Sequence, residues 1–319
     1  METLKYSLKK TALAGITNDV TEAQYRQHIS RFSKWAKDTH RIRLASDVLD
    51  SCALTQEYAN YLISCGYAPD TIHSYLAPIT KGFGISLDAI EKPKRRSSKI
   101  KKTREENANK QGLREISDEK NKRLVDAAAA IGIRRDELVA LRGDCLVRDY
   151  AGNLCVQVRS GKGGKAQMQR ILPQDESAII TLFSGLAPRE RVFSREEMNN
   201  KIPIHALRRA HAQEAYNYYL QQIQSGHRQD LIDDLKQYFQ TYHAKSPGEA
   251  GNRRLAKQYM RFCQDLYKNH GVYRLRGENL KRAQRAGRPI VYDRVALMAV
   301  SVYHLAHWRN DVTAKNYMV

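Results

Sequence analysis

The sequence predicts a mainly α-helical protein with a small antiparallel β-sheet, and three observations support this fold class. The chain has 319 residues, which is long enough for two domains that each bury a hydrophobic core. Apolar residues recur at three- and four-residue spacing over much of the chain, as on the buried face of an amphipathic helix. Segment 154–158 alternates instead, and turn-forming sequences flank it on both sides, which is typical of a hairpin strand.

Residues 1–90 are predicted to form a helical domain. The apolar spacing indicates two amphipathic helices, and a third begins at 69–71, where Asp70 is positioned to cap the first turn. By itself this pattern predicts only a small helical bundle and indicates no function. The apolar residues that repeat at helical spacing are Tyr25, Ile29, Phe32, Trp35, Tyr58, Tyr61, Leu62, Ile72, Tyr75 and Leu76.

Residues 91–116 are predicted to link the two domains. The apolar pattern stops between residues 91 and 110, and basic side chains outnumber acidic ones there. A segment without an apolar face cannot offset its ordering entropy, so we expect it to be flexible in the free protein. It would serve either as a solvated tether or as a strap whose cations contact a polyanion. Its basic residues include Lys92, Lys94, Arg95, Arg96, Lys99, Lys101, Lys102 and Arg104.

Residues 117–319 are predicted to form a second domain that contains the sheet. Helices are expected to dominate after the strands, and 216–288 is rich in helix-forming residues, with Leu231, Leu235 and Phe239 at helical spacing. The earlier elements are expected as helices over 120–131 and 134–141, a turn at 149–153, the strand 154–158, a turn at 161–164 and a strand that ends at Pro173.

The charge of the chain indicates a polyanionic partner. The formal net charge is +20 and the isoelectric point is near 9.7, and nucleic acid is the natural partner for such a surplus. No apolar run approaches the ~20 residues of a membrane-spanning helix, and no signal peptide opens the chain. We therefore expect a cytoplasmic, nucleoid-associated protein without membrane contact. The five cysteines lack metal-site spacing and are expected to be reduced thiols: Cys52, Cys65, Cys145, Cys155 and Cys263.

Four motifs follow one another along the second domain. They are GIRRDEL from Gly132, SGKGGK at 160–165, HALR at 205–208, and a segment that runs from Leu305-Ala306-His307 to Tyr317. In this order they resemble the motifs of the tyrosine recombinase (phage integrase) family. The resemblance covers the whole second domain and, more faintly, the first. Four motifs in register are far more specific than any one of them alone.

The resemblance implies a helical core-binding domain that contacts DNA, followed by a tyrosine recombinase catalytic domain. It implies a site-specific DNA recombinase or integrase that cuts and rejoins DNA through a 3′-phosphotyrosyl intermediate, for integration or excision of a mobile element. The alternative is a DNA-binding regulator that keeps the recombinase fold without cleavage. A type IB topoisomerase or a telomere resolvase shares the chemistry, but the two-domain size favours a recombinase.

Two arginines and a lysine match the family's phosphate-binding positions. Arg134 and Arg208 would neutralise the phosphodiester with planar guanidinium donors that stay protonated, and Arg135 is the rival of Arg134. Lys162 would protonate the departing 5′-oxygen, with Lys165 as its rival in the same turn. The spacing GxxxxGK[ST] of an NTPase loop is absent.

The remaining family positions concern the nucleophile and its partners. Tyr317 would attack the phosphate, and His205 would help to remove its proton. His307 would bind a non-bridging oxygen, with His304 one helical turn earlier as its rival. Glu137 would orient an arginine or a histidine. The residues predicted to contact the DNA backbone are Lys92, Lys94, Arg95, Arg96, Lys101, Lys102, Lys165 and Arg209.

The implied partners are double-stranded DNA with specific recombination sites and a homotetramer in the synaptic complex. The resemblance also allows for an accessory DNA-bending protein, and it implies no cofactor or metal because the ester conserves the bond energy. The sequence departs from the family in its long separation of Arg208 from His307, which indicates an insert at about 216–288. Two residues follow Tyr317, whereas many members continue into a docking helix. The insert is therefore expected to supply protomer or DNA contacts, or to be a peripheral elaboration.

Overall fold

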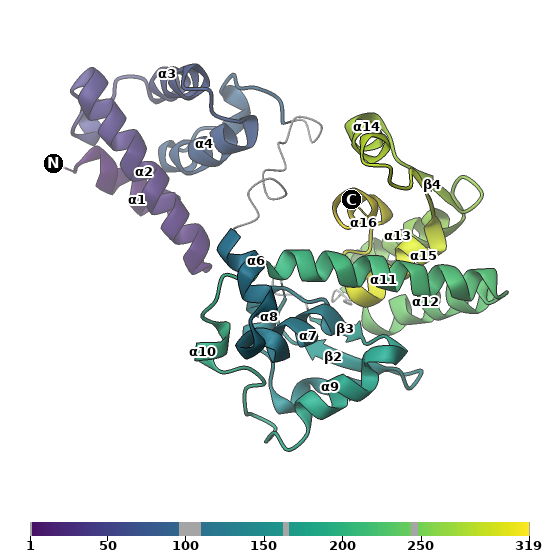
Figure 1. Cartoon of the computed structure of the whole chain (residues 1–319). Helices are drawn as coiled ribbons and strands as arrows, with labels where there is room; N and C mark the ends of the chain where they lie inside the picture. Colours follow the sequence, from purple (N-terminus) through teal and green to yellow (C-terminus); the bar gives the residue numbers. More distant parts are fainter. Residues whose placement is uncertain (1, 96–109, 162–165, 244–247, 319) are drawn as a thin grey trace. The chain divides into compact units, whose positions relative to one another are not determined.

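The computed structural model describes residues 2–95, 110–161, 166–243 and 248–318 (Figure 1). It consists mainly of helices, with a three-stranded and a two-stranded antiparallel sheet. The predicted fold class is thus confirmed at this level, with one sheet more than expected. No helix in the described part of the chain is both long and apolar enough to cross a lipid bilayer.

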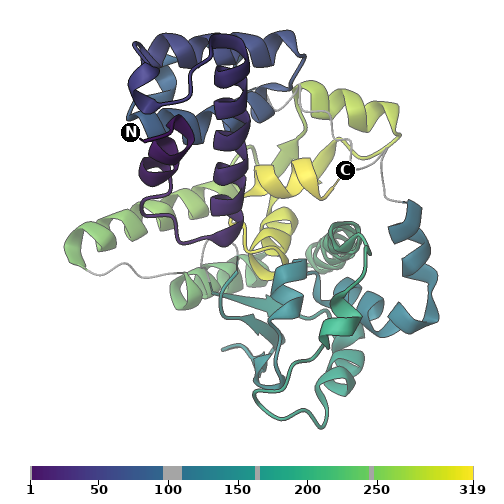
Figure 2. The same ribbon diagram turned by 90° about the vertical axis from the view of Figure 1, so that its left-hand side faces the viewer.

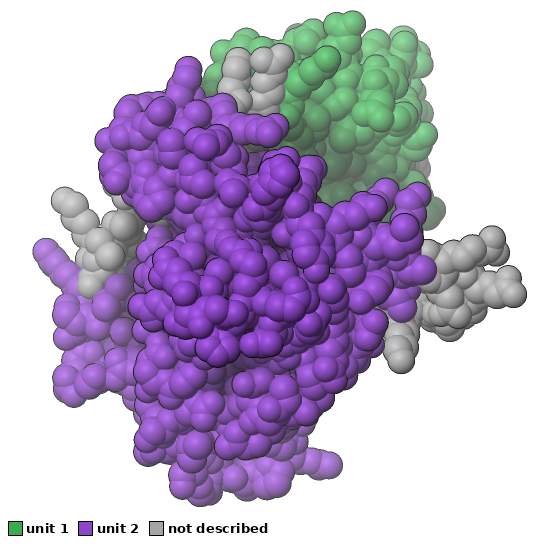
Figure 3. All heavy atoms as spheres, turned by 90° about the vertical axis from the view of Figure 1, so that its right-hand side faces the viewer, with its two compact units in different colours: residues 1–102 green, residues 103–319 purple. Residues whose placement is uncertain are grey.

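The chain divides into two compact units, residues 1–102 and 103–319, which Figure 3 colours separately. The first unit is a helical bundle whose longest helix, α2, has 22 residues (Figure 2). Its core contains Phe32 of α2, Leu62 of α3 and Leu76 of α4, all almost fully buried. Its elements are α1 (Leu4–Ala12), α2 (Asp19–His40), η1 (Ala45–Asp47), α3 (Ser51–Ser64), α4 (Pro69–Phe83) and η2 (Leu87–Ala89).

The start of α4 differs from the prediction for Asp70. Pro69, whose ring favours the first helical position, begins the helix, so Ala68 is the N-cap residue, and its methyl side chain makes no capping hydrogen bond. Asp70 therefore lies inside the first turn, and its carboxylate forms an ion pair with Arg95. The capping role assigned to Asp70 was wrong.

The predicted linker also differs at its C-terminal end. Helix α6 (Lys110–Ser117) covers the last residues of the segment 91–116. Ile116 packs against the core of the second unit, and the Glu115 carboxylate accepts a hydrogen bond from the Lys201 amide at 2.6 Å. Residues 110–116 therefore belong to the folded second unit rather than to a linker.

The first part of the second unit packs helices against the three-stranded sheet. The sheet order is β1-β2-β3, with Val156 of the central strand opposite Leu146 and Gln169. Val156 and Leu138 are fully buried in the core of this part. Its elements are η4 (Glu119–Asn121), α7 (Lys122–Ile131), α8 (Arg135–Val139), η5 (Gly143–Cys145), β1 (Leu146–Arg148), β2 (Leu154–Val158), β3 (Gln167–Arg170), η6 (Pro173–Asp175), α9 (Glu176–Phe183) and α10 (Arg195–Met198).

The second part is helical around a further core. Helix α12 folds back beside α11 (Figure 1). Leu235 and Phe239 of the predicted insert lie in the same core as Tyr303 and Tyr317, so the insert is part of the hydrophobic interior and not a peripheral elaboration. The elements are α11 (Ile204–Gln224), α12 (Arg228–Tyr242), α13 (Gly248–Tyr267), β4 (Val272–Arg274), α14 (Gly277–Arg285), β5 (Val291–Asp293), α15 (Arg294–Ala299), the π-helical turn η7 (Val300–His304) and α16 (Asn310–Asn316).

Candidate active site

Three of the predicted site residues meet at the end of α16. Tyr317 directly follows this helix, and its side chain is 6% exposed. Its phenolic oxygen lies 3.1 Å from Nε2 of His307 and 3.3 Å from Nε of Arg208. Arg208 comes from α11, and His307 comes from the turn after η7. The fold thus assembles a hydroxyl, an imidazole and a guanidinium from three separate elements.

Arg208 is the cation at the centre of this cluster. Its side chain is fully buried, and it donates hydrogen bonds to the carbonyl oxygens of Gly132 and, at 2.9 Å, Leu305. Burial lowers the pKa of Arg208 from its ordinary value. All the hydrogen-bond acceptors that the described residues offer it are neutral oxygens. The Glu137 carboxylate also acts on Arg208, but it is bonded to Arg134, so two guanidinium groups share one carboxylate. The buried site therefore keeps a net positive charge, which favours an anion.

Arg134 lies at the N-cap of α8, where Glu137 holds it. The Glu137 carboxylate is 3% exposed and accepts hydrogen bonds from the Arg134 backbone amide at 2.8 Å and from its Nη1 at 2.6 Å. The charge of Arg134 is close enough to Arg208 to lower the pKa of Arg208 further, after the larger effect of burial. Arg134 is therefore an oriented cation beside the cluster.

The neighbouring Arg135 has a different environment. Its guanidinium donates to the carbonyl oxygens of Met198 at 3.2 Å and Ile202 at 2.6 Å, and to the Asn200 side chain at 2.9 Å. These contacts fasten the start of α8 to the segment that precedes α11. The two candidate arginines thus have different environments: Arg134 lies near Arg208, whereas Arg135 holds two backbone segments together.

The two candidate histidines likewise have different environments. His304 is fully buried, 2.9 Å from Nε2 of His211 through its Nδ1 and 3.0 Å from the Tyr219 hydroxyl through its Nε2. His307 instead lies three residues later, at the phenolic oxygen of Tyr317. His304 is thus a core residue that closes a hydrogen-bond chain, and His307 is the histidine of the cluster.

An unusual backbone turn places His307. Ala306 and Trp308 on either side of it have φ values of 50° and 57°, in the left-handed region that non-glycine residues rarely adopt. Ser301 stabilises the turn, because its carbonyl accepts from the His307 amide at 2.9 Å and its hydroxyl accepts from the Arg309 amide at 2.8 Å. Such strain persists where the surrounding contacts enforce it and often marks a functional site.

The other predicted residues are less centrally placed. His205 is exposed in the first turn of α11, one turn before Arg208, and Arg209 is half-buried beside it. In the first unit, Lys92 donates to the carbonyl oxygens of Leu87 and, at 2.9 Å, Ile90, while Lys94 is exposed. Arg95 is paired with Asp70, as described above. Lys162, Lys165, Arg96, Lys101 and Lys102 lie outside the described residues.

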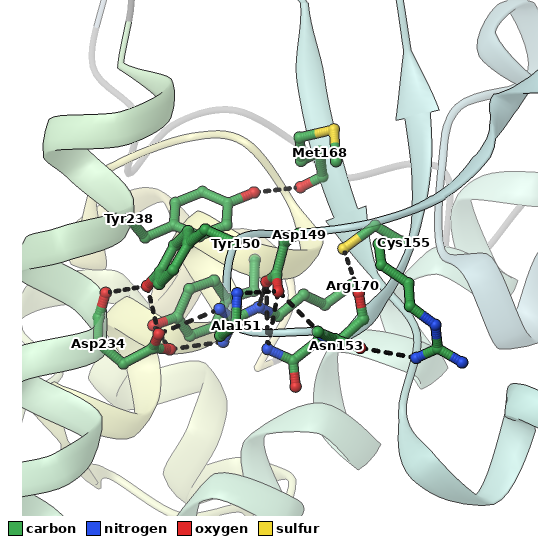
Figure 4. Close-up of polar contacts among 12 residues, drawn as sticks. Asp149, Tyr150, Ala151, Asn153, Cys155, Met168, Arg170, Asp234 and Tyr238 are labelled. Carbon is green, nitrogen blue, oxygen red and sulfur yellow. Dashed lines mark hydrogen bonds and ion pairs between the residues drawn. The ribbon is translucent and has the colours of Figure 1, made fainter.

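A buried ionic network near the site was not foreseen from the sequence (Figure 4). Arg170 of β3 contacts Asp149 at 2.7 Å and Asp234 of α12 at 2.6 Å, and Tyr303 of η7 donates to Asp234 at 2.6 Å. Burial alone would raise the pKa of Asp234, but the hydrogen bonds from Arg170, Tyr150 and Tyr303 lower it. The network joins the β2–β3 hairpin and the insert to the segment that leads to His307.

No cluster of three or more His, Cys, Asp or Glu side chains among the described residues is arranged to hold a metal ion. The five cysteines have free thiols.

Comparisons with known proteins give a limited likeness. No protein-family model matches the chain, and no curated protein matches it. Among solved structures, the chain is similar to the crystal structure of XerA recombinase, with a TM-score of 0.24 and 16% sequence identity. The match covers 80% of this chain and 97% of that chain. The site itself, rather than this likeness, supports the functional proposal.

Proposed function

We propose that the protein is a site-specific DNA recombinase or integrase that cuts and rejoins DNA through Tyr317. The observation that carries the proposal is the position of the Tyr317 hydroxyl, 3.1 Å from His307 and 3.3 Å from the buried Arg208. A hydroxyl beside a base and a cation is the arrangement that activates an oxygen nucleophile. The net charge of +20 supports a nucleic acid as substrate.

The reaction begins with the scissile phosphate between Arg208 and Arg134. Their guanidinium groups neutralise the phosphate and hold it for in-line attack. The phenolic oxygen of Tyr317 forms a bond to phosphorus, and the bond from phosphorus to the 5′-oxygen breaks. His205, predicted from the sequence to help remove the phenolic proton, is exposed. His307 Nε2 lies within hydrogen-bond distance of the phenolic oxygen, so in this proposal His307 accepts the proton instead. Lys162 or Lys165 supplies the proton that the leaving 5′-oxygen takes up.

The product is a 3′-phosphotyrosyl ester with a free 5′-hydroxyl. Because the ester conserves the energy of the broken bond, the 5′-hydroxyl of a second strand reverses the reaction without ATP. Attack by that strand exchanges the two DNA partners. The proposal includes specific recombination sites and a synaptic tetramer as the working assembly.

A covalent-trapping experiment tests the proposal. The protein is incubated with a pool of nicked duplexes of random sequence, so that loss of the short strand prevents religation and traps the ester. We expect a protein–DNA adduct that survives denaturant, whereas Tyr317→Phe binds DNA without forming it. Tyr267→Phe, which changes an exposed tyrosine (53%) on α13, is the matched control and should form the adduct normally.

Two outcomes would overturn the proposal. An adduct with Tyr317→Phe would mean that another residue is the nucleophile. DNA binding without any adduct by the unmodified protein would favour the alternative, a non-cleaving DNA-binding regulator.

A further inference from the structure

A groove of about 720 Å³ opens beside His307 and is lined by residues of α12, α13, β4 and α15 and by the segment from His307 to Asp311. Helices α13, α15 and α16 lie together in this part of the second unit (Figure 1). The volume is in the range of sites that hold a small organic ligand. All the lining residues belong to the second unit. Because His307 lines the groove and also contacts Tyr317, the groove adjoins the cluster that holds Tyr317.

Aromatic side chains form one wall of the groove. The half-buried Trp308 packs edge-on against Phe239 at 5.3 Å and against Phe262 at 6.0 Å between ring centroids. Trp308 is one of the two residues in the strained turn around His307, with φ 57°. Its position is thus tied to the same backbone feature that places His307. A wall of this kind offers a stacking surface to a planar ring.

A buried acceptor without a partner lies in the same groove. Asn310 is 1% exposed, and its Nδ2 donates to the Asp265 carboxylate at 3.0 Å. Because a carboxylate accepts hydrogen bonds, this contact identifies the amide nitrogen and therefore the oxygen Oδ1. Among the described residues, Oδ1 of Asn310 has no hydrogen-bond partner. A ligand that brings an N–H donor would satisfy it.

The charges at the groove favour a phosphate-bearing ligand. The two lining carboxylates are already paired, Asp265 with Arg294 at 2.7 Å and Asp311 with Arg309 at 2.9 Å. Two further lining cations, Arg261 and Lys268, are exposed on or just after α13. The groove thus combines an aromatic wall, an N–H acceptor and a basic rim.

A nucleobase is the ligand whose chemistry matches these features. Every DNA base has a planar ring and at least one N–H donor, and the attached phosphate suits the cationic rim. His307 both lines the groove and contacts the Tyr317 hydroxyl at 3.1 Å, so the groove lies next to the proposed scissile phosphate. A base can enter such a groove only when it is unpaired and turned out of the duplex.

We propose that this groove binds one unpaired nucleobase of the DNA strand held at Tyr317, which rests on the proposed function. The base stacks against Trp308 and donates a hydrogen bond to Oδ1 of Asn310. Arg261 and Lys268 contact the flanking phosphates. The site selects DNA that opens easily beside the cleavage position, because unpairing costs least there.

The two tryptophans of the chain, Trp35 and Trp308, make the groove directly observable. In a Trp35→Phe variant, Trp308 is the sole tryptophan, and base stacking should quench its fluorescence. This variant is titrated with a single-stranded oligonucleotide and, separately, with the same strand carrying abasic sites throughout. We expect saturable quenching by the first strand and at least tenfold weaker binding of the abasic strand.

Charge variants in this background test the rim. Arg261→Ala with Lys268→Ala should weaken binding of the base-containing strand about tenfold. Lys257→Ala with Lys281→Ala removes the same charge from exposed positions outside the groove and should leave binding unchanged. Equal effects of the two pairs would overturn the proposed contacts, since charge alone would then explain binding.

The adduct assay separates this proposal from the proposed function. If the base-containing strand and the abasic strand change Trp308 fluorescence equally while the Tyr317 adduct still forms, the groove proposal is wrong and the recombinase proposal stands. Base-dependent quenching without any adduct would instead support the groove and contradict cleavage.

Discussion

Arg208 is fully buried, yet its hydrogen bonds go to two carbonyl oxygens and the Tyr317 hydroxyl. None of these acceptors cancels the charge, so the arginine is held in position at a cost in stability. The one carboxylate that acts on Arg208, Glu137, is bonded to Arg134, and the incoming phosphate of the proposed reaction would supply a second negative charge. At the scale of single residues, two arginines share one carboxylate, and the site is thus organised for a further anion.

Lysine substitutions should distinguish the adjacent Arg134 and Arg135. Arg134→Lys keeps the charge but loses the planar donor fork, so we expect adduct formation to slow on the order of 10²-fold with little change in Tm. Arg135→Lys loses contacts to Met198, Asn200 and Ile202. It should lower Tm by roughly 3 °C per kcal/mol lost, without slowing the chemistry. Single-turnover adduct kinetics and thermal melts measure both effects, and the reverse pattern would make Arg135 the phosphate ligand.

At the scale of elements, α11 joins the site to the core. Arg208 and His211 lie three residues apart on this helix, and both contact the end of α7 near Gly132. Gly132 has φ 69°, and a Cβ there would lie 2.2 Å from the His211 ring, so only glycine fits. The same residue ends α7 and presents its carbonyl to Arg208. Packing of two helices thus sets the position of the central cation.

The buried histidine pair of α11 and η7 predicts how stability depends on pH. Burial, and then the charge of Arg208, lowers the pKa of His211 to about 4, and burial with neighbouring His211, Arg170 and Arg208 lowers that of His304 well below its usual value. Between about pH 4 and 6.5 the unfolded state therefore binds more protons than the folded state. The free energy of unfolding should fall as pH drops through this window, by up to about 1.4 kcal/mol per pH unit for each histidine.

Urea unfolding at pH 7, 6 and 5 tests this expectation. His304→Asn should reduce the loss of stability per pH unit by about half. The control is His270→Asn, which changes an exposed histidine in a left-handed conformation that asparagine accepts. An unchanged pH dependence in His304→Asn would show that the buried pair does not control acid stability.

At the scale of the whole molecule, a strongly basic segment joins the two compact units. The chain carries a net charge of +20, and the boundary between units at residue 102 falls within its most basic segment. In the described part of that segment, Lys92 contacts backbone carbonyls and Arg95 pairs with Asp70. These two cations are already engaged within the first unit. Contacts to DNA are therefore expected mainly from the basic residues that follow.

Salt dependence of DNA binding measures how many of these cations contact phosphates. Replacing Arg96, Lys99, Lys101 and Lys102 with glutamine should reduce the slope of log K against log salt by about 0.9 for each lost contact, similarly for all duplex sequences. Lys92→Gln with Arg95→Gln is the control and should have a smaller effect per residue. If the variant with all four substitutions keeps its affinity for DNA and its salt slope, the segment is only a tether.

The sequence by itself determined the local structure. Alternation and flanking turns located β2 at 154–158, and apolar spacing located α7 within the predicted helix 120–131, because both patterns depend on neighbouring residues. Spacing also predicted that Leu231, Leu235 and Phe239 share a helix face, and all three are buried on α12. The motifs supplied the candidate residues of the site.

Only the tertiary structure decided which of these residues meet. Arg208 and Tyr317 are 109 positions apart, and Arg170 and Asp234 are 64 apart, so no local pattern could predict either contact. Charged residues in a hairpin and on a helix are ordinarily expected to face water, which hid the buried network that ties the insert into the core. The groove beside His307 likewise needs α12, α13 and a left-handed turn together. Long-range packing fixes such sites because their free energy depends on surfaces that only the folded chain brings into contact.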